Sequence, residues 1–298
     1  MSDLQLSPAL RGVLLKDEPL AGYTSWHVGG KAKRFYKPFD LADLAAFLPT
    51  LPPTETIVWL GLGSNVLIRD GGINGTVIFT QGCIKELSLQ TPETIRAEAG
   101  VTCAKLAKFC ARHQLAQGAF FAGIPGTVGG ALAMNAGAFN GETWSYVTAV
   151  ETIDREGVIR KRLKQDFEVA YREVKRPANE WFVAGHFQFP LGDEQQANQA
   201  IRELLRKRGD SQPIGEFSCG SVFRNPPGDY AGRLIESCGL KGKKIGGAWV
   251  STKHANFIIN GGEATAADIE NLIENVQQVV KEQTGVSLQP ECHMVGEP

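Results

Sequence analysis

The chain has 298 residues, of which 43% are hydrophobic and 21% are charged, and its formal net charge at pH 7 is −1. This composition predicts a globular protein that is large enough for two or three compact domains with hydrophobic cores. A net charge near zero excludes broad electrostatic attraction to nucleic acid or to an anionic membrane. No apolar run approaches the roughly 18–20 residues that cross a bilayer, so the sequence predicts no membrane span.

The N-terminus and the cysteines both indicate a reducing compartment. The segment Met1–Gln5 lacks the basic region and the apolar stretch of a secretion signal, and we expect a cytoplasmic protein. The six cysteines are scattered and include no C-x-x-C pair, which favours reduced, mostly buried thiols over disulfides or a zinc site. We therefore expect no bound metal.

Strand-like and helix-like segments alternate in the first third of the chain. Asp40 is placed to cap a helix over 40–48, because an acidic residue follows three positions later. A second helix is predicted over 102–115, where Leu106, Phe109 and Cys110 share one face. Short β-rich runs predict strands over three segments: 56–60, 75–79 and 94–99.

Glycine and alanine dominate residues 118–141, too densely to predict regular structure throughout that segment. Beyond it, two strands over 147–153 and 157–163 are predicted to form a hairpin. A charged amphipathic helix is predicted over 195–208. The Gly-Asp-Ser-Gln-Pro sequence at 209–213 then interrupts the helical pattern, and we place a domain boundary there.

The last helix is signalled at both ends. Thr265 and Asp268 match a capping box, and Gly285 is the expected stop. A short strand is predicted to follow at 286–289. The predicted apolar face of the helix consists of Ile269, Leu272, Ile273, Val276 and Val280.

Two glycine-rich loops are candidates for binding a ligand. The first, Gly61-Leu62-Gly63-Ser64-Asn65, follows a predicted strand, and its backbone N–H groups could hold a phosphate. It is not the Rossmann G-x-G-x-x-G, and alone it fits a tight strand–turn better. The second runs from Gly123 to Gly130 and on through Ala138, and its interposed proline specifies a fixed path. That loop could support a flat cofactor or be purely structural.

A third motif, Ser218 to Pro226 (SCGSVFRNP), contains a serine behind a glycine. A nucleophilic serine would be expected in a G-x-S-x-G elbow, which this sequence lacks. Composition alone favours an ordinary turn here.

Together, GLGSN and GIPGTVGGALAMNAGA resemble the FAD-binding domain of the UDP-N-acetylenolpyruvoylglucosamine reductases, which is of the p-cresol methylhydroxylase type. The resemblance extends over residues 20–296. Further similar motifs are Thr24–Gly30, Gly220–Pro226, Ala231–Glu236, Gly239–Gly242, Val250–Phe257 and Leu288–Glu291. His27 stands where relatives commonly have arginine. The chain resembles the shorter type of the family, without the tyrosine-loop insertion.

The resemblance implies an α+β protein with FAD-binding subdomains at 1–75 and 76–205 and a C-terminal α/β substrate domain at 206–298. It also implies that FAD is bound non-covalently between the two glycine loops. The implied cofactor-binding residues are Gly61, Gly63, Ser64, Asn65, Gly123, Pro125, Gly126, Thr127, Gly129, Gly130, Asn135 and Gly137.

By the same resemblance, the expected reaction is NADPH-dependent reduction of UDP-N-acetylglucosamine enolpyruvate to UDP-N-acetylmuramate, a step of peptidoglycan precursor synthesis. Ser221 is then the proton donor to carbon, Arg172 stabilises the substrate carboxylate, and Glu291 is the third catalytic residue. Relatives often have serine where this chain has Val174. No nucleic acid, membrane or obligate protein partner is implied.

Three further residues are candidate substrate contacts: Asn225, His254 and Asn256. For the last two, a buried polar network is an alternative role. Two other functions remain open at this point. One is an oxidase of alcohols or sugars on the same fold, and the other is a nucleotide-binding module without catalysis.

Overall fold

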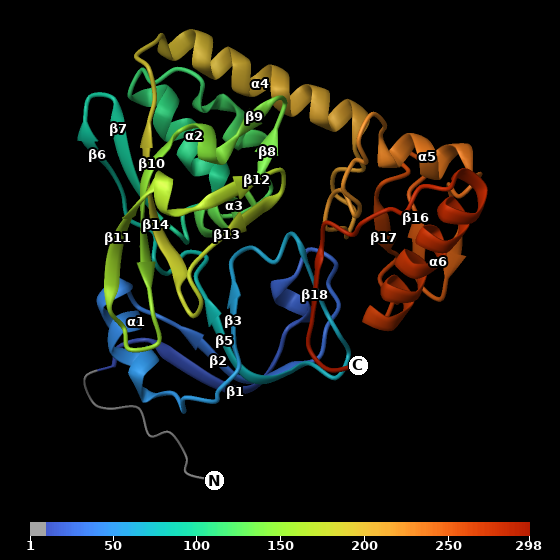
Figure 1. Ribbon diagram of the computed structural model, residues 1–298, viewed down its shortest axis with the longest axis horizontal. Coiled ribbons are helices and arrows are strands. Elements are labelled where there is room, and N and C mark those ends of the chain that lie inside the picture. Colours follow the sequence, from blue (N-terminus) through green and yellow to red (C-terminus); the bar gives the residue numbers. More distant parts are fainter. Residues whose placement is uncertain (1–9) are drawn as a thin grey trace. The chain divides into compact units, whose positions relative to one another are not determined.

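A computed structural model describes residues 10–298 of the protein (Figure 1). The segment Met1–Gln5, examined above for a secretion signal, lies outside these residues. The chain divides into two compact units. Among the described residues, the first unit contains 10–16, 34–61 and 75–206. The second unit contains residues 17–33, 62–74 and 207–298. None of the described helices is long and apolar enough to cross a membrane.

A four-stranded sheet has the order β1-β2-β5-β3. Its strands are Val13–Pro19, Lys31–Lys37, Ile73–Phe79 and Ile57–Leu60, in that order. The helix α1 (Leu41–Phe47) begins after Asp40, whose carboxylate accepts a hydrogen bond from the backbone N–H of Asp43 at 2.8 Å. This is the predicted N-cap, and it confirms the first predicted helix.

A five-stranded antiparallel sheet forms the centre of the first unit, in the order β11-β10-β14-β7-β6. In Figure 1, α2 and α3 lie on one side of this sheet. The apolar side chains of that face, Ile95 and Phe187 among them, form one core with Leu106 and Leu132 of the two helices. The bounds are Leu87–Thr91 for β6, Thr94–Glu98 for β7, Val147–Ile153 for β10, Ile159–Leu163 for β11, Trp181–Gln188 for β14, Cys103–Arg112 for α2 and Val128–Met134 for α3.

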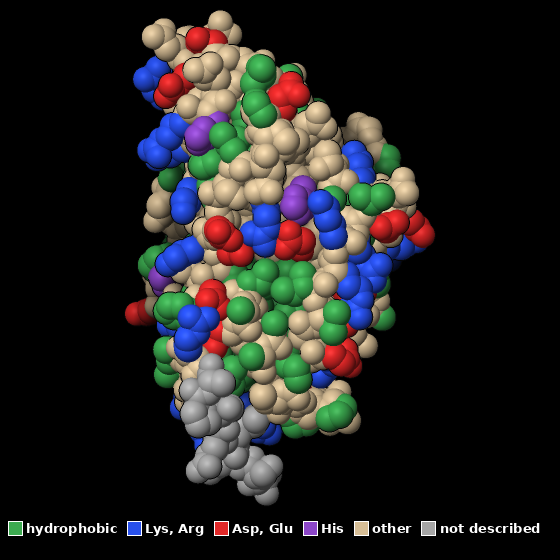
Figure 2. Space-filling model, turned by 90° about the vertical axis from the view of Figure 1, so that its left-hand side faces the viewer, with side chains coloured by type: hydrophobic (Ala, Val, Ile, Leu, Met, Phe, Trp, Pro, Cys, Tyr) green, Lys and Arg blue, Asp and Glu red, His purple; other side chains and the backbone are tan. Residues whose placement is uncertain are grey.

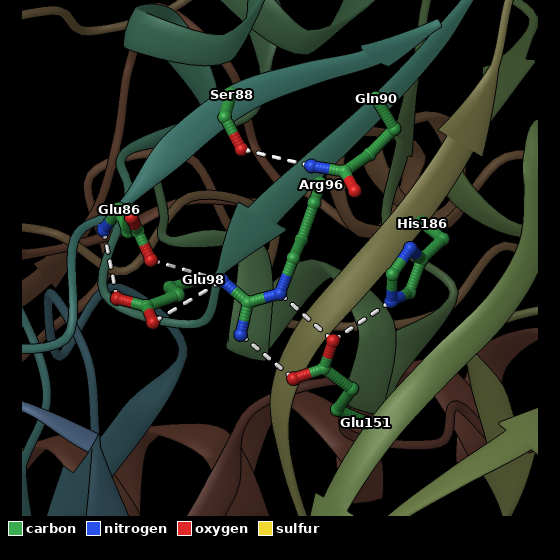
Figure 3. A network of polar contacts seen from close by, with 7 residues as sticks. All are labelled: Glu86, Ser88, Gln90, Arg96, Glu98, Glu151 and His186. Atoms are coloured by element: carbon green, nitrogen blue, oxygen red, sulfur yellow. Dashed lines mark hydrogen bonds and ion pairs between the residues drawn. The ribbon is translucent and has the colours of Figure 1, made fainter. Parts of the chain in front are cut away.

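Several polar side chains of this sheet form a charged network (Figure 3). Arg96 of β7 donates two hydrogen bonds to Glu151 of β10, at 2.8 and 2.7 Å. His186 of β14 contacts the same carboxylate at 2.8 Å. Three adjacent strands are thus linked by side chains as well as by their backbone ladders.

Outside these sheets, the chain also forms two small hairpins, several 3₁₀ helices and one long helix. The small hairpins are β8 (Gly137–Ala138) with β9 (Gly141–Glu142) and β12 (Glu168–Ala170) with β13 (Glu173–Lys175). The 3₁₀ helices are η1 (Ala21–Tyr23), η2 (Leu48–Thr50), η3 (Gly118–Gly123), η4 (Thr143–Ser145) and η5 (Lys164–Asp166). The long helix α4 spans Glu194–Ser211.

The second unit packs two helices against a small sheet. Its elements are β4 (Val66–Ile68), α5 (Ala231–Ser237), β15 (Lys244–Ile245), β16 (Ala248–Val250), β17 (Ile258–Asn260), α6 (Ala266–Thr284) and β18 (His293–Val295). The apolar face predicted for α6 is completely buried in the core of this unit. Its capping box at Thr265 and its left-handed Gly285, with φ of 74°, are confirmed.

Most predicted elements are confirmed, including the three early strands and the hairpin at 147–163. The segment 118–141 is only partly regular, as predicted, and its regular parts include η3 and α3, because the core around Leu132 stabilises helix despite the glycines. Three expectations are corrected. The helix α4 continues past 208 to Ser211, since Gly209 is free to remain helical in open surroundings. Residues 286–289 form no strand. The helix predicted over 102–115 ends at Arg112, because Gln114 has φ of 55°.

All six cysteines are free thiols, as predicted, and four of them are buried. Burial raises the pKa of Cys103 and of Cys110 to about 12. Such thiols remain protonated and behave as small apolar side chains. In residues 10–298, no group of three or more His, Cys, Asp or Glu side chains is arranged to hold a metal ion.

Candidate active site

The first glycine loop is shaped by close packing. A Cβ on Gly61 would overlap the Oγ1 atom of Thr127, so the two glycine-rich segments predicted to bind the cofactor touch at this point. Gly63 has φ of 65°, and a Cβ there would overlap the carbonyl oxygen of Tyr23. Both glycines are therefore required by the protein itself, whatever ligand the loop holds.

The side chain of Asn65 has a partner inside the second unit. Its Nδ2 donates to the backbone carbonyl of Glu291 at 3.1 Å, and the backbone carbonyl of Asn65 accepts from the backbone N–H of His293 at 3.0 Å. Asn65 thus fixes the chain that carries Glu291. Ser64, beside it, is half-buried.

The second glycine-rich segment leads into α3. Thr127 is buried and precedes the helix with extended backbone, at φ −103° and ψ 162°. The N–H groups of Val128 and Gly129 donate to the carbonyls of Val101 and Ala99, at 2.8 and 2.9 Å. These contacts fix the first turn of α3 to the strand–helix connection before α2.

One face of α3 carries almost no side-chain atoms. Gly130 and Ala133 are exposed, and Pro125, just before the helix, is exposed as well. A Cβ on Gly130 would have no neighbour closer than 3.9 Å, whereas one on Gly129 would approach the Cβ of Ala99 to 2.8 Å. Gly129 is therefore required by packing, and Gly130 leaves backbone open to a ligand. A surface with so few side-chain atoms lets a ligand approach the backbone closely.

Arg172 lies at the turn of the β12–β13 hairpin. Its backbone is left-handed, with φ of 57°, and its Nη2 donates to the carbonyl of Gly137 at 3.1 Å. A Cβ on Gly137 would overlap the carbonyl of Gly141 and approach the guanidinium of Arg172 to 3.3 Å. Gly137 is thus a neighbour of Arg172 within the first unit.

The structure brings Ser221 and Glu291 onto adjacent segments of the second unit. Phe223 and Pro290 form an antiparallel bridge. On either side of it, the N–H of Glu291 donates to Val222 at 2.7 Å and the N–H of Arg224 donates to Gln289 at 2.9 Å. Ser221 is half-buried beside this pairing.

Asn256 holds the serine loop through its backbone. Its Oδ1 accepts from the N–H of Phe223 at 3.0 Å, and its Nδ2 donates to the carbonyl of the same residue at 2.9 Å. The side chain is 4% exposed. Asn256 therefore belongs to a buried polar network, one of the two roles considered for it.

His254 and Asn225 have different surroundings. The Nδ1 of His254 accepts from the N–H of Asn256 at 3.2 Å, so the neutral ring carries its hydrogen on Nε2. Burial lowers the pKa of His254, which keeps the ring uncharged at pH 7. Asn225 is exposed, and its Oδ1 accepts from the N–H of Ala231, the first residue of α5, at 3.1 Å.

The side chains of Asn260 and Trp26 hold backbone segments of the second unit together, a role that was predicted for neither residue. The Nδ2 of Asn260 donates to the carbonyl of Trp26 at 2.7 Å, and the indole of Trp26 donates to Ile258 at 2.8 Å. Asn260 ends an apolar run before Gly261-Gly262, a turn signal that could have identified it. His27 has φ of 55° and its ring contacts that of Phe217, with centroids 4.1 Å apart.

Comparison with known families assigns a class to this arrangement. A model described as "FAD binding domain" matches residues 34–162, which include β3 to β10, α2 and α3. With the open backbone of α3, this defines the protein as a flavoprotein of mixed α and β structure.

A second model, "UDP-N-acetylenolpyruvoylglucosamine reductase, C-terminal domain", matches residues 212–295. A protein of that name from Coxiella burnetii is 60% identical, over 96% of this chain and 97% of its own length. One from Legionella pneumophila is 58% identical, over 96% and 95%. The chain belongs to the UDP-N-acetylenolpyruvoylglucosamine reductase family. The crystal structure of such a reductase from Thermus caldophilus aligns with a TM-score of 0.82 at 29% identity, over 96% of this chain and 100% of that one.

Proposed function

We propose that the protein is an NADPH-dependent flavoenzyme that reduces the enolpyruvyl group of UDP-N-acetylglucosamine enolpyruvate to give UDP-N-acetylmuramate, for peptidoglycan precursor synthesis. The identity of 58–60% with reductases of this name supports the activity. The structural observation that carries it is the pairing of the Ser221 segment with the Glu291 segment, which holds two proposed catalytic groups in a fixed register.

The residues of the first unit fit a bound FAD. The exposed backbone at Gly130, beside Ala133 and Pro125, is open to a ligand, and the contact of Gly61 with Thr127 joins the two loops. Bound FAD supplies the hydride transfer from nicotinamide to substrate. We keep the predicted cofactor-binding residues as part of the proposal, with two reassignments. Asn65 holds Glu291 by donating a hydrogen bond to the backbone carbonyl of Glu291. Asn135 is reassigned from cofactor binding to a role beside Arg172.

The proposed roles of the catalytic side chains follow from the charge that develops during reduction. Hydride addition to the vinyl carbon builds negative charge on the neighbouring carbon and its carboxylate. Arg172, permanently charged and planar, stabilises that carboxylate. Ser221 donates a proton to the carbon, and Glu291 donates to the enolate or orients the serine proton.

Two groups are proposed to bind substrate. The neutral His254 presents Nε2–H as an uncharged donor, and Asn225 is exposed, with its Oδ1 as the atom bonded to Ala231. Asn256 acts indirectly, because both ends of its amide are bonded to Phe223. The division into parts at 1–75, 76–205 and 206–298, the preference for NADPH over NADH and a cytoplasmic location are kept as parts of the same proposal.

The test is an anaerobic half-reaction. Purified protein should be yellow, with flavin absorbance at about 450 nm that NADPH bleaches. Adding the enolpyruvyl nucleotide should restore the absorbance, and adding the saturated product should not. A colourless protein would favour a nucleotide-binding module. Reoxidation by oxygen but not by the enolpyruvyl nucleotide would favour an oxidase.

A further inference from the structure

Asn135 ends α3 in a left-handed conformation, with φ of 41° and ψ of 49°, and its side chain is buried, with 2% of its surface exposed. Its position in a glycine-rich, cofactor-binding segment predicted contact with FAD. The hydrogen bonds of the side chain indicate a different role.

The donors of this amide are used inside the protein. Oδ1 accepts from the N–H of Trp144 at 3.1 Å. Nδ2 donates to the carbonyl of Ala170 at 3.1 Å and to the carboxylate of Glu142 at 3.2 Å. An asparagine amide has two N–H donors, so none remains for a cofactor. The N–H of Trp144 also fixes which end of the amide is oxygen, because a donor cannot face the NH₂ group.

These bonds lead to Arg172. Ala170 is the last residue of β12, and Arg172 is two residues further, in the turn. The guanidinium of Arg172 is in turn bonded to the carbonyl of Gly137, two residues after Asn135. The chain leaving α3 therefore holds this turn at two points, Ala170 through Asn135 and Arg172 through Gly137. A left-handed arginine persists only where its surroundings fix it.

We propose that Asn135 is a positioning residue, which holds the β12–β13 turn so that Arg172 presents its guanidinium in one orientation. The part of this inference that concerns catalysis rests on the function proposed above. Asn135 acts on the reaction through Arg172 and contributes nothing directly to FAD binding.

The test uses Asn135→Gly, because glycine keeps the left-handed conformation and removes only the side chain. Hydrogen exchange in a peptide covering 168–175 should become at least about tenfold faster, since the turn loses the hydrogen bond from Asn135 to Ala170. Flavin content and the rate of bleaching by NADPH should match those of the wild type. Asn179→Gly is the control, since Asn179 is also left-handed, with φ of 56°, and exposed. It should leave exchange in 168–175 unchanged.

The catalytic part is tested by combining Asn135→Gly with Arg172→Ala. Alone, Asn135→Gly should slow flavin reoxidation by the enolpyruvyl nucleotide by roughly 10- to 100-fold, the usual effect of misplacing a group by about 1 Å. In the Arg172→Ala background it should cause no further loss. Unchanged exchange, loss of flavin, or losses that multiply would each overturn the proposal. The exchange result stands even if the nucleotide fails to reoxidise the wild type, the outcome that would instead refute the proposed function.

Discussion

Backbone pairing between their two segments positions Ser221 and Glu291. Each side chain can therefore be substituted separately without removing the contacts that position it. The register across Phe223 and Pro290 uses N–H and carbonyl groups only, and Asn256 reinforces it through the backbone of Phe223. Substituting either side chain should therefore leave the fold of the segment intact. Changes in rate can then be read as changes in chemistry.

Ser221→Ala should retain FAD and be reduced by NADPH at the wild-type rate, because that half-reaction needs no proton at the substrate carbon. Reoxidation by the enolpyruvyl nucleotide should fall by at least the ~10²–10⁴-fold assigned to a positioned acid. Stopped-flow absorbance of the flavin measures both steps. Wild-type reoxidation in this variant would remove Ser221 from the mechanism.

Glu291 is tested by comparing two substitutions. Glu291→Gln keeps a hydrogen-bond donor and should keep partial activity, whereas Glu291→Ala should lose far more, because alanine has no donor to replace that of Glu291. Single-turnover reoxidation is the measurement, with the NADPH half-reaction as the internal control. If both variants reoxidise at nearly the wild-type rate, Glu291 is a surface residue without a catalytic role.

At the scale of elements, the packing of α3 determines which of its glycines is covered by protein and which is exposed. Two adjacent glycines in its first turn have opposite surroundings. Gly129 packs against Ala99, and Gly130 faces open space. Only a substitution of Gly130 can test for a bound ligand, because a side chain at Gly129 would collide with Ala99 even without a ligand.

Gly130→Val should fold and lose most of its flavin, because the valine would occupy the surface proposed for the cofactor. Gly209→Val is the matched control, since Gly209 is also helical and a Cβ there would meet nothing within 4 Å. The flavin-to-protein absorbance ratio and the melting temperature of each variant are the measurements. Full flavin content in Gly130→Val would show that the cofactor lies elsewhere.

The elements that could be predicted from the sequence are those specified by neighbouring residues. The last helix is an example, since Thr265, Asp268 and Gly285 mark its ends locally. The helix α3 could not be predicted, because hydrogen bonds from its first turn to Ala99 and Val101, distant in sequence, offset the cost of its glycines. The site has the same limit. The resemblance indicated Ser221 and Glu291, but the pairing of their segments depends on contacts between residues distant in sequence and could not be predicted.

At the scale of the whole molecule, charge is distributed without a dominant sign. On the face drawn in Figure 2, acidic and basic side chains are interspersed among neutral ones, with a group of hydrophobic side chains in its lower half. This agrees with the formal net charge of −1. Electrostatics therefore contribute to the molecule mainly through local pairs, and their effect on stability can be measured pair by pair.

The network of Figure 3 is one of these local groups and lies in the first unit's five-stranded sheet. Hydrogen bonds from Arg96 first, and from His186 second, lower the pKa of Glu151 from 4.5 to about 2. Because the folded pKa lies below the unfolded value, the contribution to stability is complete well above pH 4.5 and is lost as the pH falls toward 2. A shift of this size corresponds to about 3 kcal/mol, and roughly half of it should be gone by pH 3.

Glu151→Gln should accordingly lower the free energy of unfolding at pH 7 by about 3 kcal/mol, and the deficit should narrow steadily between pH 4.5 and pH 3. Urea unfolding at a series of pH values measures it. Glu168→Gln is the control, because Glu168 pairs with Lys175 while 77% of its side chain is exposed, and such pairs contribute at most about 1 kcal/mol. A deficit for Glu151→Gln that is the same at pH 3 as at pH 7 would mean that lost packing, and not the ionised carboxylate, causes it. The three strands β7, β10 and β14 would then owe their cohesion to their backbone ladders and to the apolar core on the opposite face of the sheet.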